Sequence, residues 1–528
     1  MAAILDIGDE TIRAAMERRA RETPDDVYCI FEDRPLTFAA FDTAVNRVAN
    51  GLLARGLRKG DRVALMLPSH PDHIIAIFAL AKIGLVRVPV NVHLKGPALE
   101  FLFEQFAPEA LIADSEYAPQ LIGLLDRQGL ELVVWRGTTD ASPAWAELAA
   151  HPDPEPPPVA PHPDDIIAIT PSSGTTGPPK GVLKSDRALR AGPVATRVLT
   201  DRKPGDVLLL WEALHHGAGV AVLIGAVLER ITLAMVARFS ASRFWDDARH
   251  YNVSHIHYLG GVLQMLLAQP VRPDDRAHRV RVAWGGGCPA EVWHRFEARF
   301  GVEIREGYGL SEFVTFVLVN SEGPPGAIGK PLPWYEVRLV DPEGHEVQTG
   351  EAGEMVVHAR DGRLGFLGYF RNPEASAAAW REIAGKRWYL TGDLGRQDGD
   401  GWFYYAGRSK DSVRRRGINI SAWEVERVIN EHADVEESAL VGVPGELGDD
   451  ELLIYVRPVS GRTIDPHALI RWCEPRLPYF QVPRYVAFVE DFPRTPTQRV
   501  RKGELSREVA GVWDREAARH VNTGKIAQ

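Results

Sequence analysis

A loop rich in glycine and hydroxyl residues follows directly on a short apolar run, and this junction constrains the fold more than any other segment. Residues 166–169 read Ile-Ile-Ala-Ile, which predicts a buried strand, and residues 170–181 read Thr-Pro-Ser-Ser-Gly-Thr-Thr-Gly-Pro-Pro-Lys-Gly. Glycines admit close approach of an anion, successive amides form a concave anion site, and Lys180 adds a mobile charge. The segment predicts a polyphosphate loop anchored by a strand.

Two other structures for this loop have to be weighed. Clusters of Gly, Ser, Thr and Pro are commonly flexible surface turns. The nucleotide loop Gly-x-x-x-x-Gly-Lys-Ser/Thr does not fit, because Pro179 precedes the lysine and Gly181 follows it. The strand at the entry of the loop favours phosphate binding over a free turn.

The chain around this loop twice repeats strand, helix, strand. Apolar runs at 63–67 and 86–90 flank a predicted helix at 74–83, and runs at 207–211 and 231–236 flank a predicted helix at 217–227. Such βαβ units imply parallel sheets covered by helices. We therefore expect an α/β fold whose large N-terminal domain contains two βαβ-type subdomains. Further strands are predicted at 255–259 and 280–284, and a helix capped by Ser240 at 241–250.

The pattern changes after Gly329. Short strands at 337–340, 354–358 and 402–405, separated by glycine-rich turns, predict a small β-barrel. From about residue 411 the pattern predicts a separate, small α+β unit. Its expected elements are strands at 438–443, 452–456 and 485–489, helices at 423–430 and 466–473, and a tail after Val509 that begins as a helix.

Length and composition narrow the class of protein. A chain of 528 residues is longer than one ordinary domain, and its net charge of −10 argues against non-specific nucleic-acid binding. The cysteines Cys29, Cys288 and Cys473 form no close pair, which excludes a disulfide framework and suits the cytoplasm. The N-terminus lacks the pattern of a signal peptide, and no apolar run reaches the roughly 20 residues of a membrane span. The oligomeric state is not readable, and a homodimer stays compatible with the sequence.

The loop resembles the phosphate-loop signature Ser-Ser-Gly-Thr-Thr-Gly-x-Pro-Lys-Gly of the adenylate-forming enzymes, which include acyl-CoA synthetases, peptide-synthetase adenylation domains and beetle luciferases. Further motifs extend the resemblance over nearly the whole chain. Residues 411–417 and 419–421 look most like the carnitine/crotonobetaine-CoA ligase subgroup. The resemblance implies ATP, Mg²⁺ and CoA as ligands. It implies that the ATP phosphates contact Ser172, Ser173, Gly174, Thr175, Thr176, Gly177 and Lys180.

A second motif, Glu-Gly-Tyr-Gly-Leu-Ser-Glu at 306–312, places a carboxylate four residues after an aromatic that lies between two glycines. Alone it could be any turn after a strand. An aromatic face stacks on a base, and a carboxylate suits Mg²⁺. It resembles the Tyr-Gly-x-Thr/Ser-Glu motif of the family, which implies that Tyr308 packs on adenine and that Glu312 holds Mg²⁺. Nucleotide contacts are also implied for Gly285, Gly286, Gly287, Gly307, Gly309 and Ser311.

The segment Tyr-Leu-Thr-Gly-Asp at 389–393 resembles the ribose-binding segment of the family. There the aspartate, here Asp393, accepts hydrogen bonds from both ribose hydroxyls, and Arg408 adds a donor. Lys410 falls at the hinge of the family. The implied domains are an adenylation domain at 1–409 and a mobile C-terminal domain at 410–528.

The CoA and acyl sites are implied less directly. The resemblance suggests that Arg414, Arg415 and Arg416 meet CoA phosphates, and that His215 gates the acyl pocket or contacts the carboxylate. A packed, non-catalytic histidine is the alternative for His215. The acyl pocket is expected near Trp211, His215, Tyr258, Gly260 and Gly286. No basic residue stands out as a partner for a second carboxylate, which favours a monocarboxylate substrate.

One departure from the family concerns catalysis. The C-terminal signature Pro-x-Thr-x-x-Gly-Lys contains a lysine that bridges the substrate carboxylate and the α-phosphate. Here residues 493–499 read Pro-Arg-Thr-Pro-Thr-Gln-Arg, so Arg499 stands in place of that lysine. Three explanations compete: Arg499 performs this role, Lys502 reaches the site, or adenylation is weak. We favour the first.

The resemblance thus implies an acyl-CoA synthetase in which Lys180, His215 and Arg499 are the candidate catalytic residues. A carboxylate and ATP would form acyl-AMP and pyrophosphate, and CoA would then take the acyl group. The alternatives are a nucleotide-binding homologue with weak adenylation, and a loader of the phosphopantetheine of a carrier protein.

Overall fold

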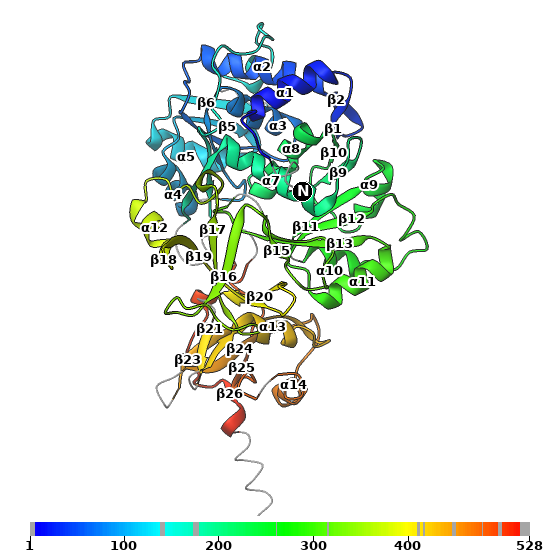
Figure 1. Ribbon diagram of the computed structural model, residues 1–528, viewed down its shortest axis with the longest axis vertical. Helices are drawn as coiled ribbons and strands as arrows, with labels where there is room; N and C mark the ends of the chain where they lie inside the picture. The colour runs from blue at the N-terminus through cyan, green and yellow to red at the C-terminus, as the bar shows by residue number, and fades with distance from the viewer. Residues whose placement is uncertain are drawn as a thin grey trace, which may run out of the picture. The chain divides into compact units, whose positions relative to one another are not determined.

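The computed structural model describes residues 6–94, 96–137, 143–172, 179–259, 261–313, 316–408, 412–415, 418–445, 450–477, 479–494 and 499–517 (Figure 1). The chain divides into two compact units. Unit 1 comprises residues 1–172, 179–337 and 357–389, and unit 2 comprises residues 173–178, 338–356 and 390–528.

A six-stranded sheet forms one layer of unit 1. Its strand order is β6-β5-β3-β4-β7-β8, and all neighbouring strands are parallel except β7 and β8. Helix α3 (Pro71–Lys82) connects the parallel strands β3 and β4, which confirms the first predicted βαβ unit. The strands are β3 (Arg62–Met66), β4 (Val86–Pro89), β5 (Ala110–Asp114), β6 (Leu132–Arg136), β7 (Ile166–Pro171) and β8 (Gly181–Ser185).

A nine-stranded sheet forms a second layer, in the order β15-β14-β13-β12-β11-β9-β10-β1-β2. Helix α8 (Gly217–Glu229) connects the parallel strands β9 and β10, so the second predicted βαβ unit is also confirmed. The strands are β1 (Val27–Phe31), β2 (Arg34–Thr37), β9 (Val207–Leu210), β10 (Thr232–Met235), β11 (His255–Leu259), β12 (Val282–Gly286), β13 (Glu303–Gly309), β14 (Phe316–Asn320) and β15 (Lys330–Pro331).

The helices of unit 1 fill three layers around these sheets (Figure 1). Buried side chains of α1, α2, α3 and α8 form one continuous core with residues of both sheets. Helices α4 and α5 cover the outer face of the six-stranded sheet, and α9, α10 and α11 cover that of the nine-stranded sheet. The remaining bounds are α1 (Ile12–Glu22), α2 (Phe38–Ala54), α4 (Pro97–Phe106), α5 (Ala118–Gln128), α6 (Trp145–Ala149), α7 (Asp186–Thr200), α9 (Phe244–His250), α10 (Val262–Leu267) and α11 (Ala290–Phe300).

The segment expected to form a small β-barrel forms a five-stranded sheet of β16 to β20. In unit 1, β18 pairs antiparallel with the first part of β19, after helix α12 (Pro373–Ala378). In unit 2, the second part of β19 pairs antiparallel with β20. The strands are β16 (Tyr335–Val340), β17 (Gly353–Ala359), β18 (Trp380–Ile383), β19 (Lys386–Gln397) and β20 (Phe403–Arg408).

Unit 2 also contains the predicted α+β fold. A four-stranded sheet in the order β23-β24-β25-β26 carries α13 and α14 on one face, where their apolar side chains share a core with the strands. Two further strands, β21 and β22, form a hairpin. The bounds are β21 (Ser412–Arg415), β22 (Ile418–Ser421), α13 (Ala422–Ile429), β23 (Val435–Pro444), β24 (Asp450–Pro458), α14 (Pro466–Cys473), β25 (Tyr485–Phe488) and β26 (Trp513–Asp514).

Two local predictions were wrong. Helix α9 begins at Phe244 and not at Ala241, because Ser240 does not cap it; its hydroxyl lies 3.3 Å from that of Ser242. The tail after Val509 does not begin as a helix, since Trp513 and Asp514 add an edge strand that pairs with β25. No helix in the described part of the chain combines the length and apolar character needed to cross a membrane.

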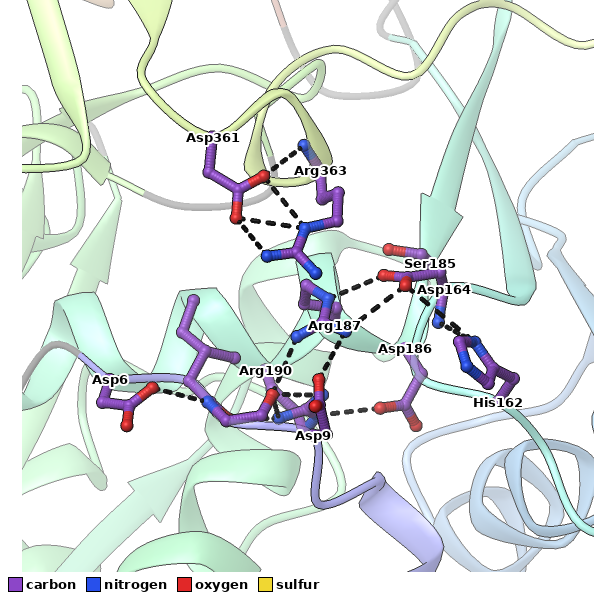
Figure 2. Close-up of polar contacts among 12 residues, drawn as sticks. Asp6, Asp9, His162, Asp164, Ser185, Asp186, Arg187, Arg190, Asp361 and Arg363 are labelled. Atoms are coloured by element: carbon purple, nitrogen blue, oxygen red, sulfur yellow. Dashed lines mark hydrogen bonds and ion pairs between the residues drawn. The ribbon is translucent and has the colours of Figure 1, made fainter.

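The first turn of α7 anchors the N-terminal segment through a polar network (Figure 2). Arg190 donates to Asp186 at 2.7 Å, and both side chains are almost fully buried. Arg187 donates to Asp164 at 2.6 Å and to Asp9 at 2.7 Å. Because these acids belong to three separate segments, the two arginines fix the start of α7 against the residues that precede α1.

Replacing Asp164 with Asn should remove a modest, pH-dependent part of the stability. The hydrogen bond from Arg187 holds the pKa of Asp164 below its usual value. A carboxylate with a lowered pKa in the folded state stabilises above its unfolded pKa, and this contribution is lost as the pH falls through the folded pKa. Asp164 is 38% exposed, so we expect a loss of about 0.5–1 kcal/mol at pH 7 and a smaller loss near pH 3. Urea denaturation at both pH values measures this difference, and an equal loss at both would contradict it.

Candidate functional site

The described ends of the predicted phosphate loop belong to the antiparallel hairpin formed by β7 and β8. Its base is closed by two hydrogen bonds, since the Ser172 amide donates to the Lys180 carbonyl at 2.8 Å and the Lys180 amide donates to the Ser172 hydroxyl at 3.0 Å. Lys180 is exposed and directly precedes β8. The two strands and the bonds between Ser172 and Lys180 therefore fix both described ends of the loop.

Tyr369 connects Lys180 with Glu312. Its backbone lies beside β8, where Leu183 donates to Gly368 at 3.1 Å. The Lys180 ammonium lies 4.9 Å from the centroid of the Tyr369 ring, which is a cation–π contact. The Tyr369 hydroxyl donates to Glu312 Oε1 at 2.9 Å. The predicted phosphate lysine and the predicted metal carboxylate thus meet on the same tyrosine.

A second lysine, Lys184, lies next to Glu312 in the fold. Lys184 is the fourth residue of β8, is 3% exposed, and donates through Nζ to the carbonyl of Ser311. Burial lowers the pKa of Lys184 to about 7, against the opposing effect of the Glu312 charge. Lys184 therefore holds the backbone of the turn that carries Glu312, while Tyr369 holds the side chain of Glu312.

The glycines near Tyr308 are required by close packing. A Cβ at Gly285 would lie 1.9 Å from the Tyr258 carbonyl, one at Gly286 would lie 3.0 Å from the Gly307 carbonyl, and one at Gly307 would lie 2.5 Å from the Phe316 ring. Tyr308 itself is buried at the end of β13, which Gly309 completes. The two glycine segments are therefore neighbours, as their shared nucleotide role would require.

Glu306 holds these two segments together. Its carboxyl group accepts hydrogen bonds from the Gly287 amide at 2.5 Å, from the Cys288 amide at 3.2 Å and from the Tyr258 hydroxyl. The residue is 1% exposed, and burial raises the pKa of Glu306 to about 7 despite these donors. Glu306 thus fixes the glycine turn to β13.

The raised pKa of Glu306 predicts a pH-dependent stability. The folded protein retains a proton on Glu306 that the unfolded chain loses near pH 4.3, so the stabilisation is present below that pH and is lost as the pH rises through about 7. We expect Glu306→Gln to reduce the fall in unfolding free energy between pH 5 and pH 8 by on the order of 2 kcal/mol. Denaturant titrations between pH 5 and pH 8 measure the unfolding free energy. If its dependence on pH is the same in Glu306→Gln and the wild type, Glu306 does not titrate in this range.

The segment after β9 carries the expected acyl-pocket residues. The Trp211 indole donates to the His257 carbonyl at 3.0 Å, and the buried Glu212 side chain is paired with the His257 ring. His215 lies 4.2 Å from His216 between ring centroids. Burial, followed by the charges of His216 and other neighbouring bases, lowers the pKa of His215 to about 3. His215 is therefore neutral at pH 7 and can accept or donate a hydrogen bond.

In unit 2, the predicted ribose residues face each other across two paired strands. Asp393 on β19 lies opposite Arg408 on β20, whose Nε lies 3.1 Å from Asp393 Oδ1. The Tyr405 hydroxyl lies 3.4 Å from the same oxygen. Arg499 is accessible at the surface, and partial burial of its guanidinium together with the Arg408 charge lowers the pKa of Arg499. Arg499 thus belongs to the group around Asp393.

Two other basic residues of unit 2, Lys502 and Arg415, form ion pairs with acidic residues of the same unit. Lys502 pairs with Glu426 at 2.7 Å, so its ammonium already has an acidic partner. Arg415 is 2% exposed, pairs with Glu451 at 2.6 Å and donates to the Phe480 carbonyl at 2.9 Å. Arg415 is thus bonded inside unit 2, and the expectation that it meets CoA phosphates stays a prediction.

Several expected site residues lie outside the described part of the chain. These are Ser173, Gly174, Thr175, Thr176, Gly177, Gly260, Lys410 and Arg416, together with the side chain of Arg414.

Sequence reasoning missed Lys184, Glu306 and Tyr369. Lys184 had no distinct signal, because a lysine between Leu183 and Ser185 is ordinary for an exposed strand end. Tyr369 had none, because its partner Glu312 lies 57 residues earlier in the chain.

The chain belongs to the AMP-binding enzyme family. The model of that family matches residues 16–370, more than half of the chain, and the model of the AMP-binding enzyme C-terminal domain matches residues 424–499. The predicted membership among adenylate-forming enzymes is therefore confirmed.

The similar proteins are ligases of coenzyme A. A crotonobetaine/carnitine–CoA ligase from Salmonella paratyphi C is 28% identical over 519 residues, which cover 94% of this chain and 99% of that protein. The corresponding ligase from Citrobacter koseri is 27% identical over 521 residues, with the same coverage. Among solved structures, ATP-bound MatB from Rhodopseudomonas palustris is 25% identical, with a TM-score of 0.83 over 93% of this chain and 98% of that protein.

Proposed function

We propose that this protein is an ATP-dependent acyl-CoA synthetase, an AMP-forming acid–thiol ligase. The observation that carries the proposal is the group in unit 1 in which Tyr369 contacts Lys180 and bonds Glu312. Family membership and the similarity to CoA ligases over nearly the full length of the chain support the same conclusion.

In the first half-reaction, an oxygen of the acid attacks the α-phosphorus of ATP, and pyrophosphate leaves. Lys180 and the loop neutralise the phosphates, Tyr308 stacks on adenine, and Asp393 accepts from the ribose hydroxyls. Arg499 stabilises the charge that develops at the α-phosphate. The bonding of Lys502 to Glu426 supports Arg499, rather than Lys502, in this role.

Mg²⁺ would be held by Glu312. One oxygen of its carboxylate accepts from Tyr369, and no hydrogen bond to the other oxygen is found among the described residues, so that oxygen fits a metal. The described residues contain no cluster of three His, Cys, Asp or Glu side chains that would hold a metal alone. This fits Mg²⁺, which usually binds through one or two carboxylates and the substrate phosphates and supplies charge neutralisation there.

In the second half-reaction, the CoA thiol attacks the carbonyl carbon of the acyl-AMP, and AMP leaves. We propose that the chain has two domains, 1–409 and 410–528. The C-terminal domain would rotate about a hinge at Lys410 between the two half-reactions. The neutral His215 lies in the segment expected to meet the acyl group, where it can contact the carboxylate or gate the pocket.

An exchange assay tests the function directly. Labelled pyrophosphate should enter ATP only in the presence of a suitable acid, and adding CoA should give a thioester with the mass of acyl-CoA. A protein that binds ATP but exchanges no pyrophosphate with any acid of a broad panel would be a nucleotide-binding homologue. Exchange without thioester formation on CoA, but with acylation of a carrier protein, would identify a carrier loader.

Two further properties belong to this proposal. We propose a cytoplasmic location, which the three free, buried cysteines support because they suit a reducing environment. A homodimer stays a prediction that analytical ultracentrifugation tests.

A further inference from the structure

Arg87 is a buried cation without an acidic partner among the described residues. It lies in the middle of β4, is 3% exposed, and its only hydrogen bond there runs from Nη1 to the Leu214 carbonyl at 3.2 Å. Burial alone lowers the pKa of Arg87 to about 10, with no carboxylate opposing it. The residue is still charged at pH 7. A buried charge without a counter-ion is costly, so it calls for an explanation.

The groups around Arg87 are basic as well. His73, near the start of α3, is 2% exposed; its Nδ1 lies 3.1 Å from the Pro68 carbonyl, and its buried Nε2 has no hydrogen-bond partner among the described residues. The charges of His216, His73, His93 and Arg87 all act on His215. The site therefore gathers one guanidinium and several imidazoles.

Water alone does not explain this arrangement. A cavity of about 20 Å³ lies beside Arg87 and is otherwise lined by apolar residues of α1, α3, β7, α7 and α8. That volume holds about one water molecule. A water can accept a hydrogen bond from the guanidinium, but it carries no charge to balance it.

The position of Arg87 connects it to the acyl site. Its guanidinium bonds the carbonyl of Leu214, the residue directly before His215, and this segment follows the carboxyl end of β9. In sheets of parallel strands, ligands bind at the carboxyl ends of the strands. Arg87 thus reaches from the six-stranded sheet to the segment that carries the expected acyl-pocket residues.

We propose that Arg87, with His73 and His215, forms a subsite for an anionic group, and that this group is a second carboxylate carried by the acid that the enzyme activates. A guanidinium presents paired donors that match a carboxylate. A single arginine inside an apolar strand does not stand out in the sequence, which is why a monocarboxylate is the expectation there. This inference rests on the proposed acyl-CoA synthetase function and names its class of substrate, a dicarboxylic acid.

The test compares dicarboxylic acids of three to eight carbons with their monoamides, which match them in size but lack the second charge. Pyrophosphate release is measured without CoA, for the wild-type protein and for Arg87→Met and Arg87→Lys. We expect kcat/KM of the wild type to favour a diacid over its monoamide at least ~10-fold, as a charge-assisted hydrogen bond would. Arg87→Met should lower this ratio ~10-fold or more, and Arg87→Lys should restore part of it.

A stability measurement separates recognition from a structural role. Without substrate, Arg87→Met should be at least as stable to urea as the wild type, because it removes an unpaired buried charge. Arg202→Met is the matched control, since Arg202 is equally buried but pairs with Glu229 at 3.0 Å. That control should lose stability and keep the diacid ratio.

The outcomes separate failure of the acyl-CoA synthetase function from failure of the Arg87 subsite. If no acid of any kind releases pyrophosphate, the proposed function fails. If acids are activated but the wild type treats diacids and monoamides alike, or Arg87→Met leaves the ratio unchanged, the subsite inference is wrong. It is also wrong if a second assay, thioester formation with CoA added, shows that Arg87→Met alters only the KM for CoA, because the anion would then be a CoA phosphate.

Discussion

Replacing Arg499 with Ala should lower the rate of pyrophosphate release by ~100–1000-fold, the effect of losing one donor aimed at a developing charge. Arg499 stands at the position where the family carries a lysine, and it lies with Arg408 near Asp393, the predicted ribose acceptor. In the proposed function Asp393 binds the ribose, so a guanidinium whose charge is felt by the same group of residues is a candidate to bind the phosphates. The measurement is the initial rate of pyrophosphate release at saturating ATP and acid.

The controls separate this role from general effects of charge. Arg501→Ala removes an exposed arginine two residues away that pairs with Glu504 at 2.8 Å, and it should change the rate less than twofold. Arg499→Ala should spare thioester formation from a synthetic acyl-adenylate and CoA. Arg499→Lys should preserve or raise pyrophosphate release. A large loss in Arg499→Lys would show that the site is built specifically around arginine, whereas an unaffected Arg499→Ala would contradict the assigned role.

The helices and strands that carry the candidate site could be predicted wherever a short stretch of sequence determines them. The apolar run at 166–169 and the glycines after it are adjacent in sequence, and the structure confirms that the run forms β7. The same holds for the βαβ units, because hydrophobic period and length decide each element within a short window. Only the family motif predicted that Arg408 and Asp393 lie close together. The strand register places the two residues opposite each other.

The residues that were missed depend on contacts between distant segments. Lys184 looks like an ordinary solvated lysine until the turn at Ser311 covers it. Arg87 looks like an arginine on a strand with one exposed face, but both faces of the six-stranded sheet are covered by helices. No local pattern reports such burial, because it is decided by the packing of the second sheet and its helices against the first.

Glu312→Gln should raise the Mg²⁺ concentration needed for half-maximal pyrophosphate release and lower the maximal rate by on the order of 100-fold. The amide keeps the size of the side chain and can still accept from Tyr369, but it no longer carries the charge that holds a divalent cation. Glu322→Gln is the control, because Glu322 is an exposed carboxylate ten positions away and should leave the Mg²⁺ dependence unchanged.

Tyr369→Phe tests whether the carboxylate must also be held in place. It removes the hydroxyl that bonds Glu312 Oε1 at 2.9 Å but keeps the ring under the Lys180 ammonium. Groups that orient a metal ligand are typically worth ~10–100-fold in metal affinity. We therefore expect a weaker apparent Mg²⁺ affinity with little change in the KM for the acid, and calorimetric binding of ATP should show the same shift in its Mg²⁺ dependence without any turnover. If both variants slow the reaction while the Mg²⁺ dependence stays that of the wild type, Glu312 does not bind the metal, and its bond to Tyr369 serves only to join two segments of unit 1.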